Sequence, residues 1–211
     1  MIELDFSVEG ARVEPHAAVP MLIVQLAVRE RQGGAVEGAA LGCQLRLEPQ
    51  RRRYSSDEEA RLAELFGATS RWRQTLKPMP WIETTLFVPS FVGHVVVDLP
   101  IACTYDLEVG AAKFFHALGD GEVTVRLLFR GTVFGRGPGG LELTPLPWDR
   151  EALWRMPVAL WRSAIDGHFP GAGWLRLRKE TIDALMRFKG RRALPSWDGV
   201  IETLLAEVET P

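Results

Sequence analysis

Apolar and polar residues alternate in short runs along the first three-quarters of the chain. In the clearest run, residues 41–47, three leucines and a cysteine occupy every second position, and glycine or polar residues occupy the others. A period of two is the pattern of a β-strand with one buried face. It predicts strands at residues 2–8, 22–28, 41–47, 82–88, 93–98, 101–109 and 122–134, and a short one at 141–143.

Helical signals interrupt these strands twice and dominate the last quarter. Ser56 to Glu59 has the form of a capping box, Gly67 ends the helix that it starts, and a second short helix is predicted at 111–118. Towards the C-terminus the apolar spacing becomes helical. There we expect a turn or two capped by Asp149 through Ala152 and Leu153, a helix led by Pro157, one at 181–189, and a last one capped by Ser196.

These elements predict a mainly β fold with α: an antiparallel immunoglobulin-like β-sandwich with inserted short helices and a helical C-terminal region. Gly-rich turns between several strands favour the sandwich over a βαβ repeat. We expect residues 1–147 to form the sandwich, with a helical insert at about 55–67, and residues 148–211 to form helices packed on it. Gly131, inside a predicted strand, indicates a β-bulge.

The composition is that of an ordinary globular protein. Of 211 residues, 46% are hydrophobic and 25% are charged, which argues against disorder. The apolar runs are much shorter than the roughly 18 residues that cross a bilayer. The N-terminal residues are acidic and alternating, unlike a secretory signal. We therefore expect a cytoplasmic protein.

The two cysteines, Cys43 and Cys103, both fall inside apolar alternation. They are too far apart in sequence for the paired-cysteine spacing of a zinc ribbon. We interpret them as buried free thiols, because free cysteine behaves as a small apolar residue. The alternative is a disulfide between the two sheets, as in immunoglobulin domains, which a reducing cytoplasm disfavours.

The sequence contains no common catalytic motif: no nucleophile elbow, phosphate-binding loop or dinucleotide fingerprint. His94 and Asp98, four residues apart on a strand, would lie about 13 Å from each other, too far to share one metal ion. His116 and Asp120 have the form of an acid/base pair, but a histidine near a helix C-terminus is also favoured by the helix dipole. We predict no catalytic residue, no metal and no cofactor.

A basic and aromatic stretch is the best candidate for a binding surface. Residues 46–77 carry 8 basic and 5 acidic side chains. Cations mixed with aromatic residues are typical of single-stranded nucleic-acid grooves, but the acidic residues among them would repel phosphate, so we expect a protein partner. The predicted partner-binding residues are Arg51, Arg52, Arg53, Trp72 and Trp81. The two tryptophans have an alternative role as core anchors at one end of the sandwich.

Five of the seven tryptophans lie in the last third of the chain. Trp and Arg are enriched at interface hot spots, so this region is a candidate docking face, and packing of the helices on the sheet is the plainer alternative. A different class of function is a small-ligand-binding protein or an enzyme. Its pocket, between sandwich and helices, would be lined by Tyr105, Trp148, Trp161 and Trp174.

Groups of residues in a fixed order complete the picture, from Val36-Glu37-Gly38 to Leu194-Pro195-Ser196-Trp197-Asp198. They lie at residues 36–54, 65–67, 71–72, 98–100, 103–106, 129–134, 147–149, 173–178 and 194–198. Over nearly the whole chain they resemble an uncharacterised bacterial family known as a domain of unknown function, whose genes often lie among uptake nickel-iron hydrogenase genes.

The resemblance implies an accessory or assembly role. With the lack of a catalytic motif, it leads us to expect a non-catalytic accessory or chaperone-like protein-binding module. Its partner would be a hydrogenase subunit or maturation factor. It assigns no catalytic residue, and it leaves a homo-oligomer open.

Overall fold

The computed structural model describes residues 2–104, 109–173 and 175–209, and the chain divides into two compact units, Met1–Trp174 and Leu175–Pro211. We call them the strand unit and the helical unit. About 41% of the chain is strand and 32% is helix, so the class is mixed α/β rather than mainly β.

The division predicted after residue 147 falls inside the strand unit. Strand β10 (Glu151–Pro157) and helix α4 (Val158–His168) both belong to that unit. The expected packing of the C-terminal helices on the strands stays a prediction.

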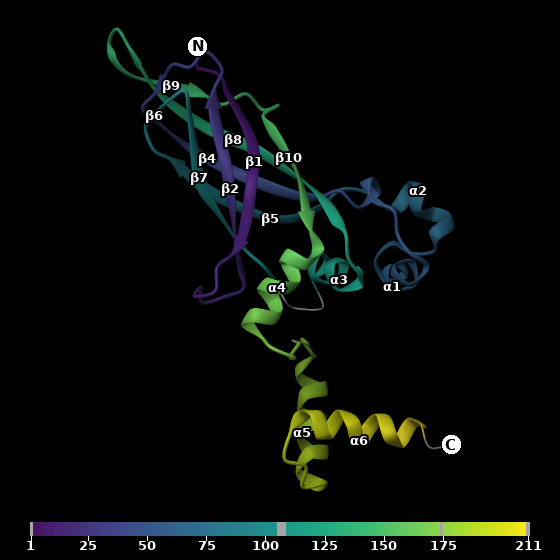
Figure 1. Ribbon diagram of the computed structural model, residues 1–211. Coiled ribbons are helices and arrows are strands. Elements are labelled where there is room, and N and C mark those ends of the chain that lie inside the picture. The colour runs from purple at the N-terminus through teal and green to yellow at the C-terminus, as the bar shows by residue number, and fades with distance from the viewer. Residues whose placement is uncertain (1, 105–108, 174, 210–211) are drawn as a thin grey trace. The chain divides into compact units, whose positions relative to one another are not determined.

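The strand unit contains two larger antiparallel sheets (Figure 1). One has the strand order β1-β2-β7. The other has the order β10-β8-β4-β5, and β9 also pairs with β8, while β3 and β6 form a small separate sheet. The remaining strands are β1 (Leu4–Val13), β2 (Met21–Glu30), β3 (Ala35–Val36), β4 (Gly38–Leu47), β5 (Met79–Val88), β6 (Phe91–Val92), β7 (His94–Ala102), β8 (Glu122–Gly137) and β9 (Gly140–Pro145).

Short helices gather at the end of the sheets opposite β9 (Figure 1). Besides α4 they are α1 (Ser56–Phe66), α2 (Trp72–Thr75) and α3 (Gly110–Ala117), with single turns at Pro49–Arg51 and Thr69–Arg71. Helix α1 begins with a capping box of Ser55 and Glu58, one residue before the predicted pair. Ser55 with Glu58 and Ser56 with Glu59 both have the spacing of a capping box. Glu58 is buried and Glu59 is not, so the pair that forms is the one with the buried acid.

The facing sides of the two larger sheets share one apolar core. The inward residues alternate along each strand, as Leu22, Val24, Leu26 and Val28 do on β2, and Leu41, Cys43, Leu45 and Leu47 on β4. Phe6 of β1 and Phe129 of β8 stack across the core with ring centroids 4.0 Å apart. Each buried side chain of this size contributes about 1.5–3 kcal/mol, so the alternation that predicts the strands also holds the sheets together.

Strand β10 replaces the helical turn that was predicted after Asp149. Along it Ala152, Trp154 and Met156 are buried and the residues between them are exposed. This is a period of two over seven residues. The predicted helical turn was wrong. Asp149 fits a helix cap, but the alternation in residues 151–157 fits a strand, and pairing with β8 stabilises the strand.

Two further predictions are corrected within the strands. A single strand, β7, crosses Pro100 and ends at Ala102, so there is no separate strand beginning at residue 101. Proline is tolerated because β7 lies at the edge of its sheet, where a missing N–H costs no pairing. Gly131 pairs with Leu41 without a shift in register, so it does not form a bulge between β8 and β4. A Cβ there would lie 2.1 Å from the carbonyl oxygen of Ala40.

The helical unit consists of α5 (Lys179–Arg191) and α6 (Trp197–Glu209). Its turn is held by Lys189, whose ammonium donates to the carbonyl oxygens of Leu194 and Pro195. The hydroxyl of Ser196 accepts a hydrogen bond from the amide of Gly199 at 3.1 Å, so the predicted cap is confirmed. None of the helices in the described parts of the chain is long and apolar enough to span a membrane.

Candidate functional site

The three consecutive arginines have different surroundings. Arg51 and Arg53 are exposed. Arg52 turns inward, where its guanidinium pairs with Glu58 and donates to the carbonyl oxygens of Asp120, at 2.7 Å, and Glu122, at 3.2 Å. Arg52 therefore ties the start of α1 to the start of β8, and of the three only Arg51, which pairs with Glu48 at 3.5 Å, and Arg53 are exposed.

Glu58 is the buried acid of this connection. Burial raises the pKa of its carboxyl, but hydrogen bonds from the amides of Ser55 and Gly119 and the positive charge of Arg52 together bring the pKa below its ordinary value. The carboxylate is thus ionised and fully engaged. These contacts stabilise the helical end of the unit and occupy the Glu58 carboxylate.

The two tryptophans of the predicted binding set also serve the fold. Trp72 is buried, and its indole N–H donates to the carbonyl oxygen of Gly67 at 2.9 Å. Trp81 is half-buried and lies against Phe115, with ring centroids 5.3 Å apart. The five predicted residues therefore do not form one surface, and the core-anchor alternative describes Trp72.

Two residues of the predicted tryptophan-lined pocket, Trp148 and Trp161, are described by the structure, and they do not line a common pocket. Trp161 is 1% exposed and stacks on Phe115, with ring centroids 5.0 Å apart. Trp148 is 91% exposed. Tyr105 and Trp174 lie outside the described residues.

Titratable groups in the described residues give no catalytic cluster. No group of three or more His, Cys, Asp or Glu side chains that could hold a metal occurs among them. Cys43 and Cys103 are free and buried, as predicted. Burial raises the pKa of each thiol to about 12, so both are protonated and unreactive at neutral pH.

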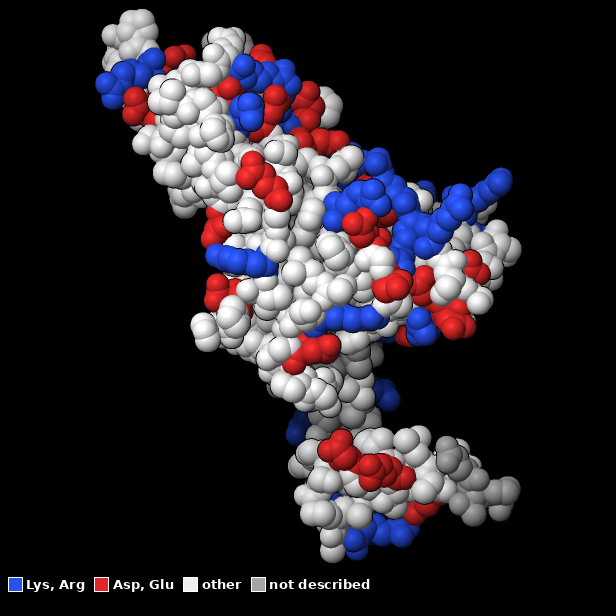
Figure 2. Space-filling model, viewed as in Figure 1, with Lys and Arg blue, Asp and Glu red and all other residues white. Residues whose placement is uncertain are grey.

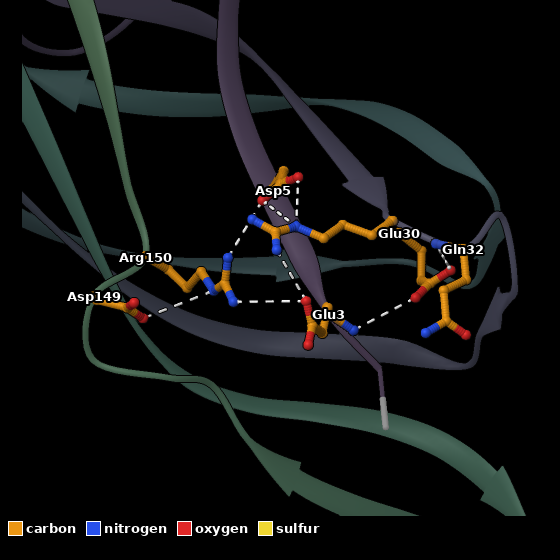
Figure 3. A network of polar contacts seen from close by, with 7 residues as sticks. Glu3, Asp5, Glu30, Gln32, Asp149 and Arg150 are labelled. Carbon is orange, nitrogen blue, oxygen red and sulfur yellow. Dashed lines mark hydrogen bonds and ion pairs between the residues drawn. The ribbon is translucent and has the colours of Figure 1, made fainter.

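A network of ion pairs joins β1 to the loop before β10 (Figure 3). Arg31 pairs with Asp5 at 2.8 Å and with Glu3 at 3.0 Å, and Arg150 lies 3.3 Å from Asp5. Glu30 accepts hydrogen bonds from the amides of Gln32 and Gly34 and closes the adjoining turn. A polar recess of about 370 Å³ lies beside these residues. Because the charges are already paired, we interpret the network as a connection between the sheets.

The outer face of the five-stranded sheet is hollowed along β4. Ala40 and Gly42 lie at its centre, with Thr85 and Phe87 of β5 on one side and Arg130 of β8 on the other, and they line a recess of about 390 Å³. Small side chains on the middle strand between larger neighbours produce this shape. We call the recess the β4 trough.

Arg130 crosses β4 over Gly42 to pair with Glu83 on β5. A Cβ on Gly42 would lie 3.1 Å from Nε of Arg130, so glycine makes room for the crossing. On the far side of Arg130 a second recess of about 200 Å³ is lined by residues that include Leu128 and Trp148. Exposed ion pairs contribute at most about 1 kcal/mol, so an approaching group can displace this one at small cost.

Further exposed apolar side chains lie on the face of the sheet that carries the β4 trough. Phe87 is 78% exposed, and on β9 Leu141 and Leu143 are 69% and 61% exposed. Leu143 pairs with Phe134 of β8, which places both on the same face as Arg130. Sequence reasoning missed this surface, although Phe87 alternates with buried Leu86 and Val88, and Leu141 and Leu143 flank a glutamate.

Figure 2 shows another side of the molecule, where acidic and basic side chains are mixed near α1 and α2. The arginine-rich stretch therefore gives no uniformly basic surface in this view. The expectation that nucleic acid is not the partner stays a prediction.

Comparisons with known proteins are sparse. No curated protein matches the sequence. Among solved structures, a β-glucosidase from Kluyveromyces marxianus matches with 8% identity and a TM-score of 0.29, over 74% of this chain and 15% of that one. β-Glucosidase 3B from Thermotoga neapolitana matches with 12% identity and a TM-score of 0.28, over 73% of this chain and 17% of that one. The chain spans a small part of these enzymes, and similarity this low carries no argument about it. A family described as of unknown function, DUF6084, matches residues 1–211.

Proposed function

The chain belongs to the family of unknown function DUF6084, and from that premise we propose that it is a non-catalytic protein-binding module of accessory or chaperone-like type. The observation that carries the proposal is the set of exposed apolar side chains on the sheet face that carries the β4 trough. Monomeric proteins rarely leave a large contiguous apolar patch in water, and such patches mark interaction sites.

The residue types on this face are those of a binding surface. Phe87 and Trp148 are aromatic and exposed, and Arg130 lies between them. Aromatic residues and arginine are enriched at interface centres. Covering one aromatic side chain contributes about 2 kcal/mol, so a partner that covers both Phe87 and Trp148 gains about 4 kcal/mol and needs further contacts around them for specific binding. The contact segment of such a partner is expected to be apolar.

We also propose that the strands are connected as in an immunoglobulin-like sandwich. Strands β1, β2 and β7 correspond to A, B and E, and the order β10-β8-β4-β5 corresponds to G, F, C and C′. An experimental structure with the same order would support this assignment. Pairing of β5 with β7 in the three-stranded sheet would contradict it.

A hydrogenase subunit or maturation factor is the first partner to test. This choice rests on the gene setting implied by the sequence resemblance, and the comparisons add nothing to it. The trough therefore needs a test that does not assume the partner.

Site-specific photo-crosslinking in the native host provides that test. A photoreactive amino acid replaces Thr85, which lines the trough, or Ser7, which is exposed on the outer face of the other sheet. We expect a discrete crosslinked protein from position 85 and none from position 7. The Phe87→Ser substitution should reduce the yield at least about tenfold, the effect of losing roughly 1.4 kcal/mol.

Two results would contradict the proposal. One is equal crosslinking from positions 85 and 7. The other is a crosslink from position 85 that Phe87→Ser leaves unchanged while the circular dichroism spectrum stays that of the wild type.

A further inference from the structure

The last helix carries an apolar stripe that its own unit covers only in part, with Lys189 Nζ 6.0 Å from the ring centroid of Trp197. Trp197, Ile201, Leu205 and Val208 recur at intervals of four, four and three residues and are 48%, 44%, 58% and 84% exposed. This spacing places them on one side of α6. Val200, which lies beside this stripe, is the one fully buried residue among the described residues of the unit.

Helix α5 adds to the uncovered surface. Ile182 and Met186, four residues apart, are 38% and 50% exposed, and no described residue of α5 is buried. Each of the two helices thus exposes apolar side chains, in addition to Val200, which is buried within the unit. A helix with apolar residues in both directions belongs inside a larger bundle.

The unit is also too small to be stable by its own contacts. Below roughly 40 residues a fold needs disulfides, metal ions or association with other chains. Residues 175–211 contain neither Cys nor His, so a disulfide and the usual structural zinc ligands are excluded. Packing on the strand unit of the same chain and association with another chain remain.

The charges indicate what the unit associates with. Residues 175–192 carry seven basic and two acidic side chains, and residues 193–211 carry four acidic and no basic ones. In Figure 2 the acidic side chains of this unit gather over α6. One pair, Arg192 and Glu207, already joins the two helices within the unit at 2.6 Å. A basic helix beside an acidic one is complementary to its own copy when that copy is turned by a two-fold axis.

We propose that α5 and α6 pair with the same helices of a second chain to form an antiparallel four-helix bundle. The two-fold axis places α5 of one chain beside α6 of the other, so that opposite charges meet at the rim. The stripe of Trp197, Ile201, Leu205 and Val208 becomes part of the bundle core. Two helical hairpins joined in this way are a common dimeric bundle. The inference is independent of the function proposed for the β4 trough.

Sedimentation of the full chain over a range of concentrations tests the proposal. We expect a dimer that the double substitution Ile201→Glu and Leu205→Glu dissociates, with the dissociation constant raised at least about 100-fold, as for loss of central apolar anchors. The matched control, Leu141→Glu with Leu143→Glu, adds the same charge at exposed leucines of the strand unit. It should remain a dimer.

Far-UV circular dichroism supplies a second readout. Dilution of the wild type below its dissociation constant should lower the helical signal while the strand unit stays folded. A wild type that is monomeric at all concentrations would overturn the proposal, and so would a dimer that survives the α6 substitutions. The proposal would also be overturned if only the control variant, Leu141→Glu with Leu143→Glu, dissociated the dimer. That result would place the interface on the strand unit.

Discussion

The strand unit and the helical unit use the same kinds of side chain in opposite ways. In the strand unit Trp72 and Trp161 are buried and the Arg52 guanidinium is held by one carboxylate and two carbonyl groups. In the helical unit Trp197 is 48% exposed, and the apolar stripe of α6 faces outward. The difference is the amount of chain around them. Residue type indicates which contact a side chain favours, and the surrounding chain decides whether that contact is made within the molecule.

The largest difference in stability is expected between alanine variants of Trp161 and Trp148, the two tryptophans of the predicted pocket that the structure describes. Replacing Trp161 by Ala should lower the free energy of unfolding by about 4 kcal/mol, because a buried indole leaves a cavity. Replacing Trp148 by Ala should change it by less than about 0.5 kcal/mol, as for other surface positions. Urea unfolding followed by far-UV circular dichroism measures both. Similar losses in the two variants would show that Trp148 is also enclosed.

The next effect separates neighbouring arginines. Arg52→Gln should cost about 3 kcal/mol, since it leaves the Glu58 carboxylate buried without its cation. Arg51→Gln removes a contact at 3.5 Å to the buried carboxylate of Glu48, which Arg126 still holds at 2.7 Å, and should cost at most about 1 kcal/mol. Urea midpoints of the two variants give the comparison. An Arg52→Gln variant as stable as the wild type would contradict the role assigned to this ion pair.

A smaller effect is expected in acid. Because the folded state lowers the pKa of Glu58, its contribution is complete above the ordinary value of 4.5 and is lost as the pH falls below it. The Glu58→Gln variant lacks this titration, so it should lose less stability than the wild type between about pH 6 and pH 3. Unfolding measured across that range tests the sign. Equal acid losses would mean that other carboxyl groups dominate.

Much of the fold was predictable because alternation is a local property. Residues 22–28 and 41–47 carry it without interruption, and both lie in strands as predicted. Strand β10 carries it too, but Asp149 also fits a helix cap, and only pairing with β8 settles the choice. The sequence also predicted two strands where β7 is one strand that continues through Pro100. Proline is tolerated there because β7 is an edge strand, and the sequence alone does not show that position in the sheet.

The candidate site was much less predictable. Arg51, Arg52 and Arg53 are identical in sequence, yet one is enclosed because Glu58 and the β8 start lie within reach of it. The β4 trough combines residues of three strands that are distant in the chain. The small size of Ala40 and Gly42 produces a recess only because Phe87 and Arg130 flank them. The sequence alone does not show that these four residues are neighbours.

Strand β8 has a consequence for the order of events during synthesis. Its 16 residues pair with β4 on one side and with β10 and β9 on the other, and Leu41 meets Gly131 across the β4 pairing. Such distant pairings form late, because a long loop has to close before any contact rewards it. The five-stranded sheet is complete only after Pro157 has left the ribosome. The β4 trough needs Arg130 of β8 on one side, so the binding site that we propose exists only after β8 has been synthesised.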